Sequence, residues 1–131
     1  HRGLPNRFRS VARAETVLFD APSDKARKVF IAPAGMPVEV ISVLRDWVKF
    51  RDVQGDLSWV NRDLLSDRRM VITRAPDTLR REPRAEGEPL LDVAADVLFE
   101  LVDDKPTGEF ARVRDAGGDV GFLPVASVWG L

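Results

Sequence analysis

The chain has 131 residues, a net charge of −1 and no cysteine. This length allows one domain or two small ones, and the near-neutral charge provides no overall field for nucleic acid or a membrane surface. The absence of cysteine excludes disulfides, thiol chemistry and cysteine-ligated zinc. No apolar run approaches the roughly 18 residues of a membrane-spanning helix. No signal peptide is visible, and a start at His1 without Met indicates a trimmed or processed chain.

The first half reads as short strands separated by turns. Residues 1–9 are polar and basic, and order is expected from about Phe8. A Pro-containing turn at 20–24 follows from the φ of proline and the local hydrogen bonds of Asp and Ser. One helical turn is expected at 61–64, before a last strand. The other apolar segments, several rich in β-branched residues, are expected as strands: 11–19, 28–32, 38–44, 47–53 and 57–60.

The segment 47–53 alternates in a way that typifies a half-buried strand. Val48 and Phe50 share one face, while Trp47, Lys49 and Arg51 share the other. The first face is expected to lie in a core, and the second keeps its charges in water.

The second half repeats the first. Arg51-Asp52 corresponds to Arg114-Asp115 at an offset of 63, and upstream Leu18 corresponds to Leu79 at an offset of 61. The change of offset falls in a single loop, which is where a structural repeat tolerates insertions. The sequence therefore predicts two domains, residues 1–68 and 69–131, joined by the short linker 66–69, which restrains them relative to each other.

The two halves differ in charge. Residues 1–68 carry 12 Lys and Arg against 9 Asp and Glu, and residues 69–131 carry 8 against 12. This difference is either scatter on solvated surfaces or an attraction between the halves or toward a partner. Residues 80–89 form an exposed polar loop. No segment sustains a helical period over three turns, so the many short strands and Gly or Pro turns predict an all-β chain.

Both halves carry a recognisable order of motifs: a Pro-bearing loop, a strand that begins with an aromatic-x-basic triplet (Trp-x-Lys in the first half), a Gly turn, an aromatic strand and a final Leu or Val. In the first half these are Pro22, Trp47-Val48-Lys49-Phe50, Gly55, Trp59-Val60 and Leu64-Leu65; in the second they are Pro83, Phe110-Ala111-Arg112-Val113, Gly118, Gly121-Phe122-Leu123 and Val128. Each half thus resembles a bacterial Src-homology-3 domain. The resemblance implies an all-β chain of two tandem Src-homology-3-like five-stranded barrels packed together, as a cell-envelope module that is periplasmic or secreted.

Eukaryotic relatives of these domains bind polyproline in an aromatic groove. The matching positions are Phe19, Ala21, Trp47, Asn61 and Leu64 in the first half, and Arg80, Glu82, Phe110, Pro124 and Ser127 in the second. The chain contains no Tyr, and the second half cannot supply flat aromatic walls.

The candidate ligand-binding residues all lie in the first half: Phe19, Trp47, Lys49, Arg51 and Leu64. An exposed indole beside cations suits a ligand with an apolar or sugar face and carboxylates, such as a peptidoglycan stem or an acidic peptide. The alternative is that Trp47 packs into a core or between the repeats.

Catalysis has no support in the sequence. The one histidine is His1, so a triad or a metal site lacks its base or ligand. Asp52, Asp56, Asp115 and Asp119 are interpreted as turn residues. We expect no catalytic residue, metal, cofactor or nucleic acid, and a partner that is peptidoglycan or an envelope protein. The alternative function is a protein–protein scaffold that uses an inter-repeat groove or an edge strand.

Overall fold

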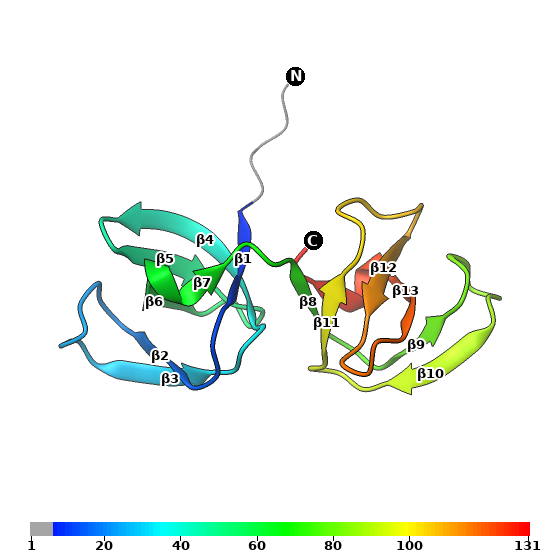
Figure 1. Cartoon of the computed structure of the whole chain (residues 1–131), viewed down its shortest axis with the longest axis horizontal. Coiled ribbons are helices and arrows are strands. Elements are labelled where there is room, and N and C mark those ends of the chain that lie inside the picture. Colours follow the sequence, from blue (N-terminus) through cyan, green and yellow to red (C-terminus); the bar gives the residue numbers. More distant parts are fainter. Residues whose placement is uncertain (1–6) are drawn as a thin grey trace, which may run out of the picture. The chain divides into compact units, whose positions relative to one another are not determined.

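The computed structural model describes residues 7–131, and their regular secondary structure is β-strand apart from two short 3-10 turns (Figure 1). The chain divides into two compact units, and the boundary falls between Arg68 and Arg69. The expectation about order before Phe8 concerns residues 1–6, which lie outside the described residues.

The first unit is one antiparallel sheet in the order β3-β2-β6-β5-β4-β1-β7. A single 3-10 turn, η1 (Arg62–Leu64), precedes the last strand. Among the described residues its strands are β1 (Phe8–Val11), β2 (Thr16–Phe19), β3 (Lys28–Ala32), β4 (Pro37–Leu44), β5 (Trp47–Arg51), β6 (Leu57–Asn61) and β7 (Leu65–Ser66).

The second unit has the same topology, in the order β10-β9-β13-β12-β11-β8-β14. Its 3-10 turn is η2 (Val125–Ser127). Its strands are β8 (Met70–Thr73), β9 (Asp77–Arg80), β10 (Pro89–Val93), β11 (Leu98–Leu101), β12 (Phe110–Arg114), β13 (Val120–Pro124) and β14 (Val128–Trp129). Because each strand of one sheet has its counterpart in the other, the predicted duplication is confirmed.

The all-β prediction is confirmed, but within residues 7–131 the two units are seven-stranded sheets that do not close, instead of the predicted five-stranded barrels. Each sheet has seven strands in the described chain, and no pairing joins its two outermost strands. The expected first segment is divided at Glu15, whose φ of 57° turns the backbone. As a result β1 pairs with β4 and β7, while β2 pairs with β3 and β6. Packing of one unit on the other stays a prediction.

The hairpin turns repeat in atomic detail. The Oδ1 atom of Asp52 accepts the backbone N–H of Asp56 at 2.9 Å, and Asp115 accepts that of Asp119 at 2.7 Å. The glycine three residues after each of these aspartates has a φ near 90°, namely +90° and +94°, which is left-handed backbone that glycine adopts without strain. Asp52 and Asp115 are therefore turn residues, as the sequence indicated.

Each unit has its own apolar core, and the two cores place one Phe and one Val at opposite positions of the same pair of strands. In the first unit Val38 on β4 and Phe50 on β5 are both fully buried. At the equivalent positions of the second unit stand Phe99 and Val113, which are 2% and 0% exposed. The phenyl ring therefore lies on β5 in the first unit and on β11, the counterpart of β4, in the second. Because each pair consists of one Phe and one Val, the summed side-chain volume is the same in both cores.

Candidate functional site

An aromatic pair lies at the surface of the first unit. Phe19 ends β2 and Trp47 begins β5, and their rings meet edge to face with centroids 5.6 Å apart and planes at 86°. This is a favourable geometry for two quadrupoles. Phe19 is 9% exposed and Trp47 is half-buried, so the indole presents part of its surface to solvent. Trp47 is thus neither buried in the core nor fully exposed to solvent.

The pair borders a pocket of about 500 Å³, a size within the range of small-molecule and peptide subsites. Apolar side chains line part of it: Val17, Phe19, Trp47 and Leu64. Asn61 on β6 is the register partner of Trp47 on β5, and it also lines the pocket. The pocket therefore combines an aromatic wall with polar edges.

The charged groups of this pocket are mostly acidic. Glu15, Asp24 and Asp63 line it together with one cation, Arg13. None of the three carboxylates forms an ion pair within residues 7–131. Asp63 is held in η1, where its backbone N–H donates to Oδ1 of Asn61 at 2.9 Å. The site consequently favours a ligand that carries a positive charge.

The five residues chosen from sequence divide into two groups. Phe19, Trp47 and Leu64 line the pocket together, whereas Lys49 and Arg51 are not among its lining residues. Lys49 and Arg51 do lie on the outer face of β5 with Trp47, as the alternation indicated. A ligand in this pocket therefore meets the aromatic pair and carboxylates rather than the cations of β5.

Arg51 has a structural role that recurs in the second unit. Its Nη1 atom is 3.0 Å from Oε1 of Glu39, across the β4–β5 pair. Arg114 and Glu100 form the same ion pair at 2.9 Å. A contact present in both units supports the sheet itself and marks no particular ligand.

Sequence reasoning missed Arg13, Glu15 and Asp63 as pocket residues. They come from the turn between β1 and β2 and from η1, and no local motif connects these segments. The match of Asn61 and Leu64 to the aromatic-groove positions was the available signal, because Asp63 lies between them.

The second unit has a related but different pocket of about 410 Å³. Phe110 replaces Trp47 and lies opposite Pro124, just as Trp47 lies opposite Asn61. The position of Phe19 is taken by Arg80, which pairs with Phe122 as Phe19 pairs with Trp59. The aromatic pair is thus absent from this pocket, which is lined by Pro106, Gly108, Glu109, Phe110, Pro124, Val125 and Ala126.

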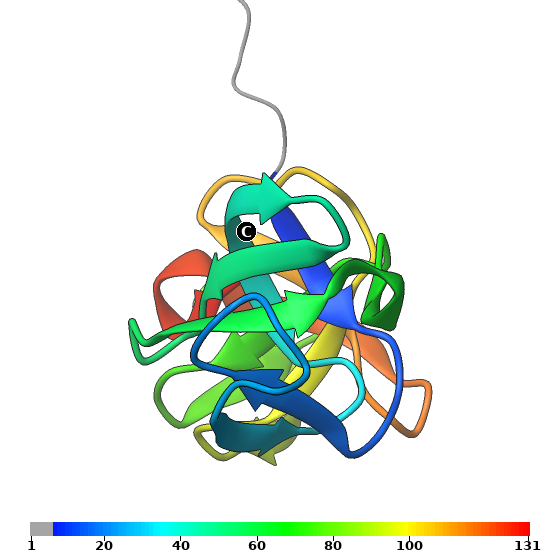
Figure 2. The same cartoon turned by 90° about the vertical axis from the view of Figure 1, so that its left-hand side faces the viewer.

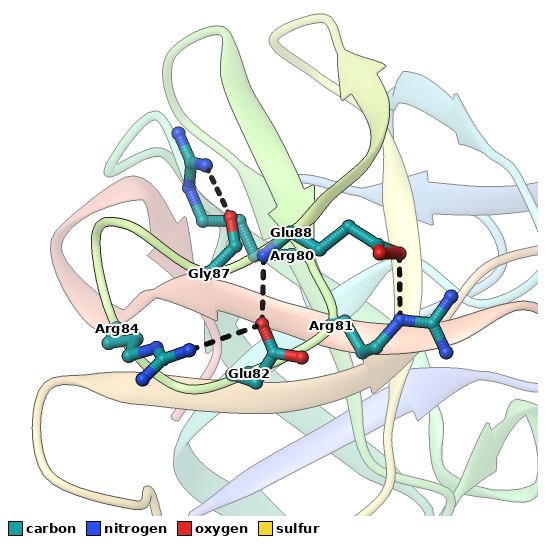
Figure 3. A network of polar contacts seen from close by, with 6 residues as sticks. All are labelled: Arg80, Arg81, Glu82, Arg84, Gly87 and Glu88. Carbon is teal, nitrogen blue, oxygen red and sulfur yellow. Dashed lines mark hydrogen bonds and ion pairs between the residues drawn. The ribbon is translucent and has the colours of Figure 1, made fainter.

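Arg80 instead fixes the loop between β9 and β10 (Figure 3). Its Nη1 atom donates to the carbonyl of Gly87 at 2.9 Å, while Oε1 of Glu82 accepts the backbone N–H of Glu88 at 2.8 Å. Arg81 and Glu88 join the two arms of this loop at 2.9 Å. Much of the arginine-rich segment predicted as an exposed loop is therefore internally bonded.

Neither a group of metal-ligating side chains nor a membrane-spanning helix is present in residues 7–131. This part of the chain holds no group of three or more His, Cys, Asp or Glu side chains arranged to hold a metal ion. Nor does it contain a helix long and apolar enough to span a membrane.

Comparison with known proteins found a family model that matches part of the first unit. Residues 12–67 match the model of the bacterial SH3 domain family. A comparison with curated proteins found no match.

Three solved structures show a loose likeness to the whole chain. NlpC1 from Trichomonas vaginalis is 16% identical, with a TM-score of 0.43 over 92% of this chain and 44% of that one. NlpC2 from the same organism is 13% identical, with a TM-score of 0.44 over 93% and 46%. An NlpC/P60 family protein from Bacillus cereus ATCC 10987 is 15% identical, with a TM-score of 0.41 over 93% and 55%. The chain spans about half the length of these structures.

Proposed function

Because residues 12–67 match the model of the bacterial SH3 domain family, we propose that this chain is a non-catalytic binding module of the cell envelope. Its ligand is a peptide, taken either from the stem of peptidoglycan or from an envelope protein. The pocket at Phe19 and Trp47 receives it, and the protein acts in the periplasm or outside the cell.

The observation that carries this proposal is the edge-to-face pair of Phe19 and Trp47 at the pocket. The partly exposed indole of Trp47 is held by the nearly buried ring of Phe19, and such an aromatic side chain provides a large contact area at low conformational cost. The equivalent pocket of the second unit lacks the pair. Ligand binding is therefore assigned to the first unit.

The carboxylates that line the pocket favour peptides of a particular charge. Glu15, Asp24 and Asp63 around one arginine favour a ligand with a free amino group. Peptidoglycan stems that are not cross-linked offer such an amine on their diamino acid, beside small apolar side chains. A lysine-containing or arginine-containing envelope peptide offers the same chemistry.

Binding without catalysis agrees with the groups that surround the pocket. Its lining contains no histidine, cysteine or lysine. The hydroxyl of Thr16 donates to the carbonyl of Arg13 at 2.7 Å and is 4% exposed as a residue. A nucleophile paired with a base, which hydrolytic chemistry needs, has no candidate here.

The test is sedimentation with purified sacculi, followed by competition with soluble stem peptides. Trp47→Ala is expected to lower the affinity by at least 2 kcal/mol, the roughly 30-fold loss of a hot-spot aromatic. Phe110→Ala, at the equivalent position of the second unit, is the matched control and is expected to bind as the wild type does. If the wild type does not sediment with sacculi, peptidoglycan is excluded and an envelope peptide remains as the ligand. Equal loss in both variants contradicts the assignment to the first unit.

A further inference from the structure

Strand β3 presents an apolar edge to solvent. Val29, Phe30 and Ile31 are 39%, 55% and 63% exposed, although they are consecutive in the strand. In the described chain β3 pairs with β2 alone and forms the end of the sheet, as Figure 2 shows for the first unit. Natural proteins usually protect such an edge because it can pair with another extended chain.

The second unit protects the same edge. Its strand β10 carries Pro89 at the position of Lys28 and Asp92 at the position of Ile31. Proline has no backbone N–H to offer, and an exposed charge opposes burial, so both residues discourage strand addition. The fold therefore does not require the apolar edge that β3 displays.

The two edges also differ in charge at their beginning. Lys25, Arg27 and Lys28 lead into β3 and are exposed, and the Arg27 side chain is 80% exposed with Asp20 as its ion-pair partner at 3.7 Å. In the second unit the equivalents of Lys25 and Arg27 are Glu86 and Glu88. An incoming chain beside the start of β3 would thus meet positive charge.

We propose that β3 is a docking edge for an extended segment of a partner protein. The segment pairs antiparallel with Lys28–Ala32, is apolar along its centre and carries carboxylates at its C-terminal end. The apolar centre covers Val29, Phe30 and Ile31. The carboxylates lie beside the cations that precede β3, because an antiparallel strand ends where β3 begins.

A second copy of the chain fits this edge less well. Antiparallel pairing of β3 with itself about Phe30 would set Lys28 opposite Ala32, which supplies no carboxylate. Parallel self-pairing would set the two lysines side by side, and like charges in adjacent strands repel. A partner segment of different sequence and acidic end satisfies both the apolar and the charged part of the edge.

The probe is an acetylated synthetic peptide with a Val-Thr-Val-Thr-Val centre and three C-terminal glutamates. Nuclear magnetic resonance titration is expected to shift amide signals of residues 28–32 and to slow their hydrogen exchange. Ile31→Lys should weaken binding at least ten-fold. Asp92→Lys places the same residue at the equivalent position of β10 and should change nothing.

A second set of variants tests the contact between the cations at the start of β3 and the glutamates of the peptide. Lys28→Glu, and separately a peptide with lysines in place of its glutamates, should each weaken binding at least ten-fold. Equal affinity for both peptides would overturn the proposal, and so would shifts centred on the pocket of Phe19 and Trp47. Concentration-dependent dimers that Ile31→Lys abolishes, seen by analytical ultracentrifugation, would overturn it in favour of a second copy. If Ile31→Lys lowers the thermal midpoint, Phe30→Ser serves as the edge variant with the same expected outcomes.

Discussion

The ring of Phe19 packs edge to face on the indole of Trp47, and this contact joins the end of β2 to the start of β5. It fixes the aromatic wall of the pocket in the first unit. The second unit keeps an aromatic residue at Phe110 but has Arg80 where Phe19 stands, and Arg80 donates to the loop carbonyl of Gly87. One duplicated fold therefore presents two different surfaces.

The acidic rim of the pocket should control affinity for amines. Asp24→Asn combined with Asp63→Asn is expected to weaken binding of an amine-bearing stem peptide, because two of the three carboxylates become neutral. The loss should be smaller at high salt, which already screens exposed charges. Isothermal titration calorimetry measures it, with Asp92→Asn as the control. Stronger binding by the double variant would show that the pocket faces a carboxylate of the stem peptide instead of its amine.

The ion pair of Arg51 and Glu39 should contribute little to stability. Both side chains are partly exposed, and such pairs contribute about 0–1 kcal/mol. A double-mutant cycle with Arg51→Ala and Glu39→Ala, followed by urea unfolding, gives the coupling free energy. A coupling above about 2 kcal/mol, or loss of ligand binding with Arg51→Ala alone, would contradict a purely structural role.

Phe and Val occupy opposite positions in the two cores, which predicts that two mutations in the first core compensate each other in stability. Phe50→Val alone should leave a cavity and cost of the order of 2–3 kcal/mol. Val38→Phe alone should overpack the core and cost about 1–3 kcal/mol. The double variant copies the arrangement of Phe99 and Val113, so its destabilisation should be smaller than the sum by about 1 kcal/mol or more. Additive losses in urea unfolding would mean that the two cores are built differently.

The short connection between β7 and β8 leads us to expect that the units stabilise each other. Asp67 in this connection pairs with Arg9 of the first unit at 3.0 Å, and Arg69 donates to the carbonyl of Gly130 in the second at 2.8 Å. Residues 8–68 alone should melt at a lower temperature than the full chain, because a small domain is marginally stable by itself. Equal midpoints by circular dichroism would show independent units.

Local sequence determined the repeat, most strands and the turns. The alternation from Trp47 to Arg51 predicted which side chains enter the core, and the Asp and Gly residues of the hairpins predicted turns that the structure contains. These features depend on the period of a strand and on the φ that glycine adopts, which neighbouring residues decide. The aromatic candidates Phe19 and Trp47 followed from their match to the aromatic-groove positions of Src-homology-3 domains, and Trp47 also from the alternation of its strand.

Tertiary structure decided what surrounds those aromatics. Glu15, Asp24 and Asp63 belong to three separate segments, and only the pairing of β2, β5 and β6 brings them to one pocket. The exposure of Val29, Phe30 and Ile31 likewise depends on β3 being the end of its sheet. An apolar strand has the same local pattern at an edge as in the middle of a sheet. Its exposure depends on the neighbours that the fold provides, and those come from distant parts of the chain.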